Sequence, residues 1–222
     1  MLRFVVKRIG LSIMTLIMVS LIVFLMTSIL PGDIAKQTLG RDASTEAYEI
    51  WNKEKGFDKP LVVQYGRWMG GVVTGDLGIS LQYEQPVSEI LGPAAGKSAQ
   101  LAIVALILIA PISILGGIAA AMNRGKKVDR VLTVGGLSAA VIPEFVWAVV
   151  LILVFGVAIR AFPVSAFPDE ENPNIFNSIY HLLLPSIALL FVLFGYISRI
   201  TRAGVIEALD SDYMRTAVLK GL

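Results

Sequence analysis

Residues 9–30 read IGLSIMTLIMVSLIVFLMTSIL, an uncharged run that follows a basic start with Arg3, Lys7 and Arg8. A helix needs about 20 apolar residues to cross the hydrocarbon core of a bilayer. A cleaved signal peptide has an apolar region of about 7 to 15 residues and a small-residue cleavage site. This run is longer and lacks such a site, so it predicts a first membrane-spanning helix with its basic N-terminus in the cytoplasm.

The composition of the whole chain is also that of a membrane protein. Of its 222 residues, 55% are hydrophobic and only 16% are charged, and the mean hydropathy is +0.73. These values are typical of integral membrane proteins and exclude an ordinary soluble domain. The chain has no cysteine and one histidine, which excludes thiolate metal sites, disulfides and histidine clusters. We therefore predict an all-α polytopic membrane protein.

Three further apolar segments are long enough to span a bilayer, at residues 99–122, 131–159 and 180–197. With the first run they give about four transmembrane helices. The loop at 123–130 is short and basic, whereas the segment 160–178 carries an acidic cluster at 169–171.

Basic residues between the spans predict the orientation of the chain, because cytoplasmic loops carry an excess of Lys and Arg. We expect Lys126 and Lys127 to lie inside and Arg160 to lie outside. Four spans then return the basic C-terminal segment to the side of the N-terminus, so the assignment is consistent along the chain.

Residues 33–96 are polar and contain no stretch long enough to span, which predicts a small helical segment outside the membrane. Ser44 or Thr45 can cap a first helix that ends near Gly56, and Pro60 suits the first turn of a second helix. The second helix has an apolar stripe that we expect to pack mainly against the outer ends of the spans; it comprises Leu61, Val62, Tyr65, Trp68, Met69, Val72 and Val73.

The segment 92–98, GPAAGKS, has some features of a phosphate-binding loop. That loop needs four residues between its two glycines and follows a strand. Here Leu91 occupies the position of the first glycine, and no strand is predicted before it. We therefore exclude a nucleotide site at this segment.

Pro143 and Glu144 lie in the middle of the apolar segment 131–159. A carboxylate within the membrane is costly unless it faces a cavity or a partner, which makes Glu144 a candidate pathway residue. Alternatively, the carboxyl group is held neutral by desolvation or bonds carbonyl groups freed by a kink at Pro143. His181 is a single histidine near the outer end of the last span, and we interpret it as a hydrogen-bonding residue at a helix end.

The C-terminal segment 198–222 turns from apolar to charged and predicts two short helices separated by Asp210-Ser211-Asp212. In the second helix one face is apolar and is formed by Tyr213, Met214, Ala217 and Val218. Lys220 suits the negative end of the helix dipole, and Gly221 can adopt a left-handed conformation that ends the helix. An apolar stripe with a basic flank predicts a docking surface, the alternative being a helix lying on the membrane.

This segment resembles the coupling loop of permease subunits of ABC importers, in the dipeptide, oligopeptide and nickel branch. The pattern of that branch, Asp-Tyr-x-Arg-Thr-Ala-x-x-Lys-Gly-Leu, is matched by Asp212, Tyr213, Arg215, Thr216, Ala217, Lys220, Gly221 and Leu222. Glu207 and Ala208 do not fit, since no glycine follows at the required spacing. The exit from the first span at 31–33, Pro-Gly-Asp, and the phrase GFDKPL at 56–61 are similar to the same branch.

The resemblance implies a type I ABC importer permease fold in the cytoplasmic (inner) membrane of a bacterium or archaeon. It implies partners as well: the lipid bilayer, a second permease subunit, two cytoplasmic ATP-binding subunits and an external substrate-binding protein, but no nucleic acid. ATP hydrolysis belongs to the partners, so we expect no enzymatic activity, no cofactor and no metal site in this chain. Pro143, Glu144 and Phe145 are the expected pathway residues, and the family keeps the proline and the aromatic residue more reliably than the acid.

We expect residues 1–98 to form the first span with the external segment, and residues 99–222 to begin the transmembrane domain. Family members continue beyond the position of Gly221, so we expect a truncated reading frame or a fragment of a permease for peptides or similar small solutes. Two alternatives are a self-contained secondary transporter and a non-functional fragment of a permease. A secondary transporter predicts several ionisable groups within the membrane or an internal repeat, and only Glu144 qualifies.

Overall fold

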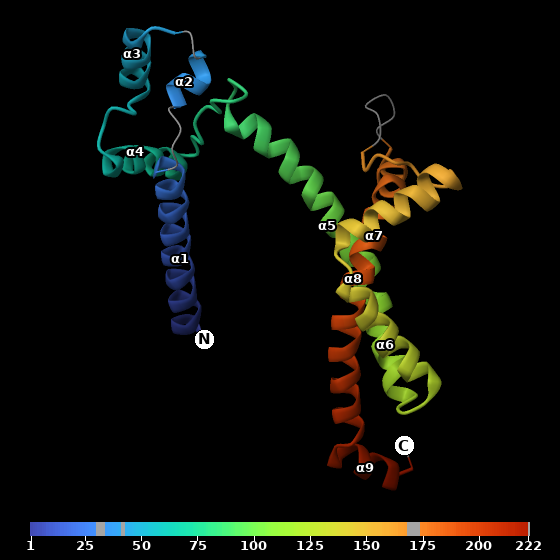
Figure 1. Ribbon diagram of the computed structural model, residues 1–222. Coiled ribbons are helices and arrows are strands. Elements are labelled where there is room, and N and C mark those ends of the chain that lie inside the picture. Colours follow the sequence, from blue (N-terminus) through green and yellow to red (C-terminus); the bar gives the residue numbers. More distant parts are fainter. Residues whose placement is uncertain (30–33, 41–42, 168–173, 222) are drawn as a thin grey trace. The chain divides into compact units, whose positions relative to one another are not determined.

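The computed structural model describes residues 1–29, 34–40, 43–167 and 174–221, and these are helical apart from connecting turns and one isolated bridge between Ile79 and Pro86 (Figure 1). The Pro-Gly-Asp exit at 31–33, the acidic cluster at 169–171 and Leu222 lie outside the described residues. The chain divides into two compact units, Met1–Ala94 and Ala95–Leu222, which are described separately below.

The described residues contain three helices that are long and apolar enough to cross a membrane, or four if one bent helix pair is counted as a span. Together these helices confirm the predicted all-α polytopic membrane protein. In the first of these helices, α1 (Leu2–Ile29), no part of the apolar window is buried within the chain, which suits a helix that faces lipid or another subunit.

The first unit continues with α2 (Ile34–Leu39), α3 (Thr45–Lys55) and α4 (Leu61–Thr74). The predicted caps are confirmed: the Ser44 hydroxyl accepts a hydrogen bond from the Ala47 amide at 3.2 Å, and α3 ends at Gly56 with a φ of +78°. Pro60 directly precedes the first turn of α4.

Helix α4 packs on α1 through Tyr65, whose hydroxyl lies 2.8 Å from the Ser20 hydroxyl and whose ring meets Phe24 edge to face at 5.4 Å. This agrees with the expected packing of the apolar stripe. Val62 and Val73, two other members of that stripe, are exposed in the unit. Only part of the stripe is therefore covered within the first unit.

The second predicted span is longer than expected, because α5 runs over Val87–Met122 without a break. The predicted span 99–122 lies within this helix, and the end of the predicted external segment, including residues 92–98, is helical too. Residues 87–98 include Ile90, Leu91 and two alanines, which favour a helix, and the helix continues through Pro93, as membrane helices can. Residues 92–98 therefore form no phosphate-binding loop.

The third predicted span is not a continuous helix. Helix α6 (Lys127–Val141) is followed at 97° by α7 (Glu144–Leu151), which continues as the π-helix η1 (Ile152–Ala158). Ile142 has an extended backbone, as is usual before a proline, and Pro143 starts a new helix. The sequence pattern predicted one span because the residues on both sides of this corner are equally apolar.

The fourth predicted span is confirmed but extends further at both ends, as α8 (Ile175–Leu209). The preceding loop therefore ends before residue 175, and His181 lies inside the helix instead of at its end. The predicted break follows α8, and α9 (Asp212–Leu219) is the last helix.

Helix α8 forms the core of the second unit. Leu184 and Ala188 of α8 are buried against Leu151 of α7, and Trp147 and Phe191 flank them with ring centroids 4.6 Å apart. Further along α8, Gly195 lies against Gly136 of α6 so closely that a Cβ atom on Gly195 would be 2.4 Å from the Gly136 carbonyl oxygen. Small residues allow such backbone contact between membrane helices.

Candidate coupling helix and pathway residues

Helix α9 begins after the predicted break at Asp210-Ser211, but no side chain caps its N-terminus. Ser211 has an extended backbone and precedes the helix, while its hydroxyl donates back to the Ala208 carbonyl at 2.5 Å instead of capping α9. The Thr216 hydroxyl donates to the Asp212 carbonyl at 2.9 Å, and Arg215 pairs with Asp212 at 3.5 Å on the surface. Helix α9 is thus a short helix held largely by its own backbone.

The far end of α9 follows the predicted pattern. The Lys220 amide donates to the carbonyls of Thr216 and Ala217, each at 3.1 Å. Gly221 has a φ of +81°, the left-handed conformation that glycine adopts without steric cost, which confirms the predicted helix end. A β-branched residue at Gly221 would be strained.

The apolar side of α9 is only partly covered within the chain. Met214 and Ala217 are half-buried, while Tyr213 and Val218 are 64% and 65% exposed. An open groove of about 560 Å³ lies on this side and is lined by Leu209, Met214, Arg215, Val218 and Leu219. The groove therefore includes the end of α8 as well as α9, an extension that the helical pattern of α9 alone did not predict.

The corner between α6 and α7 brings Pro143, Glu144 and Phe145 to the surface of the second unit, where all three are exposed. Glu144 is in the first turn of α7, a favourable position for a carboxylate near a helix N-terminus. Among the described residues, no salt bridge joins Glu144 to a basic side chain.

A residue that the sequence reading missed, Trp147, closes this corner. Its indole Nε1 donates to the Ala139 carbonyl at 3.0 Å, so Trp147 satisfies an acceptor near the end of α6. In the described residues, the Glu144 carboxyl makes no hydrogen bond to a carbonyl group at this corner; Trp147 makes that bond instead. A tryptophan four residues after a proline, at the end of an apolar helix, is the sequence signal for this contact.

The sequence reading also missed a polar cluster at the other end of α6. The buried Asp129 carboxylate accepts hydrogen bonds from Arg202 Nε at 2.6 Å and from Arg202 Nη2 at 2.7 Å. It also accepts from the Gly125 amide at 2.9 Å and from the Thr133 hydroxyl at 3.2 Å. The sequence signal is a single acid at the start of a helix within an otherwise basic loop.

His181 hydrogen-bonds within the chain: its Nδ1 lies 2.9 Å from the Ser165 carbonyl oxygen. The neighbouring Tyr180 hydroxyl donates to the Ala161 carbonyl, and its ring stacks with Phe162 at 5.3 Å. His181 is therefore a hydrogen-bonding residue, as predicted, and with Tyr180 it holds the segment after η1 against α8.

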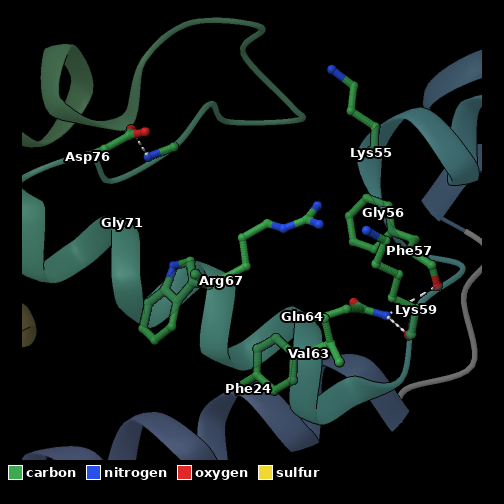
Figure 2. Close-up of a pocket in the computed structure, with 12 residues that line it drawn as sticks. Phe24, Lys55, Gly56, Phe57, Lys59, Val63, Gln64, Arg67, Gly71 and Asp76 are labelled. Carbon is green, nitrogen blue, oxygen red and sulfur yellow. Dashed lines mark hydrogen bonds between the residues drawn. The ribbon is translucent and has the colours of Figure 1, made fainter.

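A pocket of about 380 Å³ in the first unit lies between α3, α4 and the turn that follows α4 (Figure 2). Gln64 closes one wall, since its Nε2 donates to the Lys59 carbonyl at 2.7 Å and to the Phe57 carbonyl at 3.2 Å. Arg67 projects from α4 toward Lys55 and Gly56. Most of the lining comes from the segment predicted to lie outside, including Lys55, Lys59, Arg67, Asp76, Phe57 and Trp68, and α1 adds Phe24.

The arrangement is that of a polytopic helical membrane protein with a short amphipathic helix after its last described span. Residues 1–98 match the family described as "Binding-prot-dependent transport system membrane comp, N-term", and residues 112–222 match "Binding-protein-dependent transport system inner membrane component". The chain belongs to this family of binding-protein-dependent inner membrane permeases.

Individual relatives cover nearly the whole chain. The chain is 33% identical to the dipeptide transport system permease protein DppB of Escherichia coli K12 over 245 residues, which cover 100% of this chain and 72% of that protein. It is 32% identical over 219 residues to a putative peptide transport system permease protein of Brucella abortus, covering 98% of this chain and 69% of the relative. A probable peptide ABC transporter permease of Sinorhizobium fredii is 31% identical over 218 residues, covering 98% and 69%.

Family membership confirms the resemblance inferred from the tail motif and the outer segment. The chain is a multi-pass permease subunit of an ABC transporter in the inner membrane, and such permeases are not catalytic. The roles of the residues in α9 and at the corner between α6 and α7 stay predictions.

Proposed function

We propose that this permease imports peptides or similar small solutes and that α9 is the helix through which ATP-binding subunits drive it. Two relatives named as peptide transport permeases and one named for dipeptides support the substrate class. The observation that carries the coupling role is the open apolar groove of α9 directly after α8, at the predicted coupling motif.

The shape and charge of this end of the molecule support docking to a protein. Leu219 is 88% exposed and Val218 is also exposed, so the groove has apolar surface to bury. Arg215 lines it and Lys220 directly follows its last lining residue in the chain, which suits a partner surface with acidic residues. Burial of such a patch with a basic rim is the usual anatomy of a protein interface.

The proposed complex contains a second related permease, two ATP-binding subunits and an external binding protein that delivers the substrate. Two features support these partners: the family depends on a binding protein, and α1 together with large parts of α5 leaves apolar surface uncovered. Pro143, Glu144 and Phe145 then belong to the substrate pathway, where an exposed carboxylate can face a hydrated cavity.

The proposed orientation has the N-terminus, the turn at 123–126 and α9 in the cytoplasm. The basic residues Arg3, Lys7 and Arg8, together with Lys126 and Lys127, support it. The 222 residues contain no cysteine, so single cysteines at Lys127 and at Arg160 can be labelled on intact cells with an impermeant thiol reagent. Arg160 should react and Lys127 should not; the reverse labelling contradicts the orientation.

The decisive experiment measures co-purification of the permease bearing this sequence with its ATP-binding subunits. Ala217→Asp places a carboxylate on the half-buried side of α9, where burial without a partner is costly, and should abolish most of the complex. Gly221→Val should weaken it too, because valine resists a φ of +81°.

The matched control is Ala203→Asp, the same substitution at an exposed position of α8 away from the groove. It should leave the complex and the stimulation of ATP hydrolysis by loaded binding protein unchanged. Wild-type complex formation by both α9 variants rejects the coupling role and favours a helix that lies on the membrane.

A further inference from the structure

Asp129 joins three segments of the second unit through one carboxylate. It accepts from the Gly125 amide in the turn after α5, from the Thr133 hydroxyl one turn along α6, and from both Nε and Nη2 of Arg202 in α8. We call Asp129, Arg202, Gly125 and Thr133 the polar brace. Each carboxylate oxygen accepts two hydrogen bonds, so the position and orientation of the carboxylate are fixed from several sides.

The burial of the polar brace makes it rigid. Asp129 is only 7% exposed, and its side chain and that of Arg202 form a fork with two short, charge-assisted hydrogen bonds. A planar guanidinium in this bidentate arrangement fixes orientation as well as distance, which a lysine at the same place does not. The start of α6 is therefore held in one register against α8.

Helix α8 is held on a second side by backbone contact. A Cβ atom on Gly117 of α5 would lie 2.6 Å from the Ser198 carbonyl oxygen and equally close to Thr201 Cβ. Ser198 and Thr201 belong to the turn of α8 that carries Arg202. The same turn is thus fixed by α5 on one side and by the polar brace on the other.

The end of α8 continues from Arg202 to Leu209 without interruption and leads into α9 after two residues. A helical rise of about 1.5 Å per residue places Leu209 about two turns beyond Arg202. Next to this junction Arg124 pairs with Asp210 at 3.1 Å, but both side chains are exposed at 61% and 67%. The buried contact at Asp129 is therefore the stronger constraint on where α9 projects.

We propose that Asp129 and Arg202 are positioning residues that fix α9 relative to α6, so that movement of α9 is passed to the corner at Pro143 at the other end of α6. The proposal rests on the proposed function, in which α9 contacts an ATP-binding subunit. It adds a path by which movement of α9 reaches the substrate pathway, because α6 begins at the polar brace and ends next to the predicted pathway residues.

The first experiment measures the position of α9 directly, without ATP-binding subunits. Spin labels on cysteines at Lys127 and Leu219, both exposed, report the distance between α6 and α9 by pulsed electron paramagnetic resonance in nanodiscs. The unaltered chain should give a single narrow distance peak. Arg202→Gln should lose that peak, because the Asp129 carboxylate no longer has its guanidinium partner.

Two further variants keep this experiment interpretable. Arg199→Gln removes an exposed arginine from the preceding turn of α8 and should keep the narrow peak. Arg202→Lys keeps the charge but loses the fork; it should broaden the peak while the protein still inserts and elutes as a single species, which excludes a folding defect. A narrow peak in both Arg202 variants, or equal broadening by Arg199→Gln, overturns the proposal.

The second experiment uses the complete transporter and counts ATP molecules hydrolysed per peptide imported. Arg202→Gln and Arg202→Lys should raise this ratio roughly fivefold or more, the lower end of typical coupling between separate sites. Arg199→Gln should keep the wild-type ratio. A normal ratio in variants whose distance peak is lost overturns the positioning role, because α9 would then work without a fixed orientation.

Failure of the proposed function has a different signature. If α9 does not dock on an ATP-binding subunit, Ala217→Asp leaves co-purification intact, whereas the distance measurement still responds to Arg202. If α9 docks but the polar brace has no role, Ala217→Asp disrupts the complex while the Arg202 variants keep both the peak and the ratio.

Discussion

The second unit has two helix corners, one between α6 and α7 and one between α8 and α9, and they are built in opposite ways. The first corner lies within apolar sequence, turns by 97° at Pro143 and is closed by the indole of Trp147 on the Ala139 carbonyl. The second has Asp210 and Ser211 in the connection and is closed by the Ser211 hydroxyl on the Ala208 carbonyl.

The difference explains why one corner was predicted and the other was not. Short polar side chains compete with helical hydrogen bonds, so Asp210 and Ser211 reveal a helix end in the sequence. Pro143 is compatible with either a kink or a complete break within a membrane helix. In that apolar setting, the angle depends on which side chain satisfies the freed backbone groups.

The largest expected effect concerns the contact between α6 and α8 that lies between the two corners. Gly195→Ala places a Cβ atom 2.4 Å from the Gly136 carbonyl oxygen, where backbone must move. The free energy of unfolding should fall by about 1–3 kcal/mol, the usual cost of overpacking. Thermal unfolding in detergent measures this, with Gly135→Ala, which has open space, as the control. Equal stability of the two variants contradicts a close contact between α6 and α8.

Trp147→Phe tests how the apolar corner is closed. Phenylalanine keeps most of the ring packing on Phe191 but removes the donor to the Ala139 carbonyl, which should cost about 1 kcal/mol of stability. The same thermal unfolding measures the loss, and Trp51→Phe in the other unit provides the control, because no hydrogen bond of Trp51 Nε1 is described. Equal stability losses in Trp147→Phe and Trp51→Phe would mean that the Trp147 hydrogen bond does not stabilise the corner and that Pro143 alone determines it.

Arg124→Gln makes the corresponding test next to the polar corner. The pair with Asp210 is exposed, and exposed pairs contribute at most about 1 kcal/mol, so thermal stability should change less than in Trp147→Phe. Adding salt should remove even this difference, because ions screen exposed charges. A larger loss than that of Trp147→Phe reverses the comparison and makes the polar corner the more tightly closed of the two.

Glu144→Gln should have the smallest effect on stability and a visible effect on function. Glu144 is exposed and has no described salt bridge, so the unfolding free energy should change by less than about 0.5 kcal/mol. If Glu144 lines the pathway, peptide uptake by the complete transporter should change while membrane insertion persists. Unchanged uptake kinetics would mean that Glu144 has no role in the pathway and serves only as a favourable charge in the first turn of α7.

The sequence by itself determined where most helices lie and what class of protein this is. An uncharged run such as 9–30 must form a helix in the membrane, because in hydrocarbon every backbone polar group needs a hydrogen-bond partner within the chain. Its apolar side chains are then covered by lipid or by other helices. Local chemistry likewise determined the cap at Ser44, the left-handed ends at Gly56 and Gly221, and the break before Asp212. The tail motif identified the family, which the comparisons confirm.

Only the tertiary structure decided which residues meet. Asp129 and Arg202 are 73 residues apart, and nothing in the sequence around either one predicts the other as its partner. The same holds for Gly136 with Gly195, since a glycine in an apolar helix is compatible with a kink, a lipid-facing surface or a close contact. The sequence pattern predicts which segments are helical and which face of α9 is apolar, whereas the corner angle and the buried ion pair depend on how separate helices satisfy one another's polar groups.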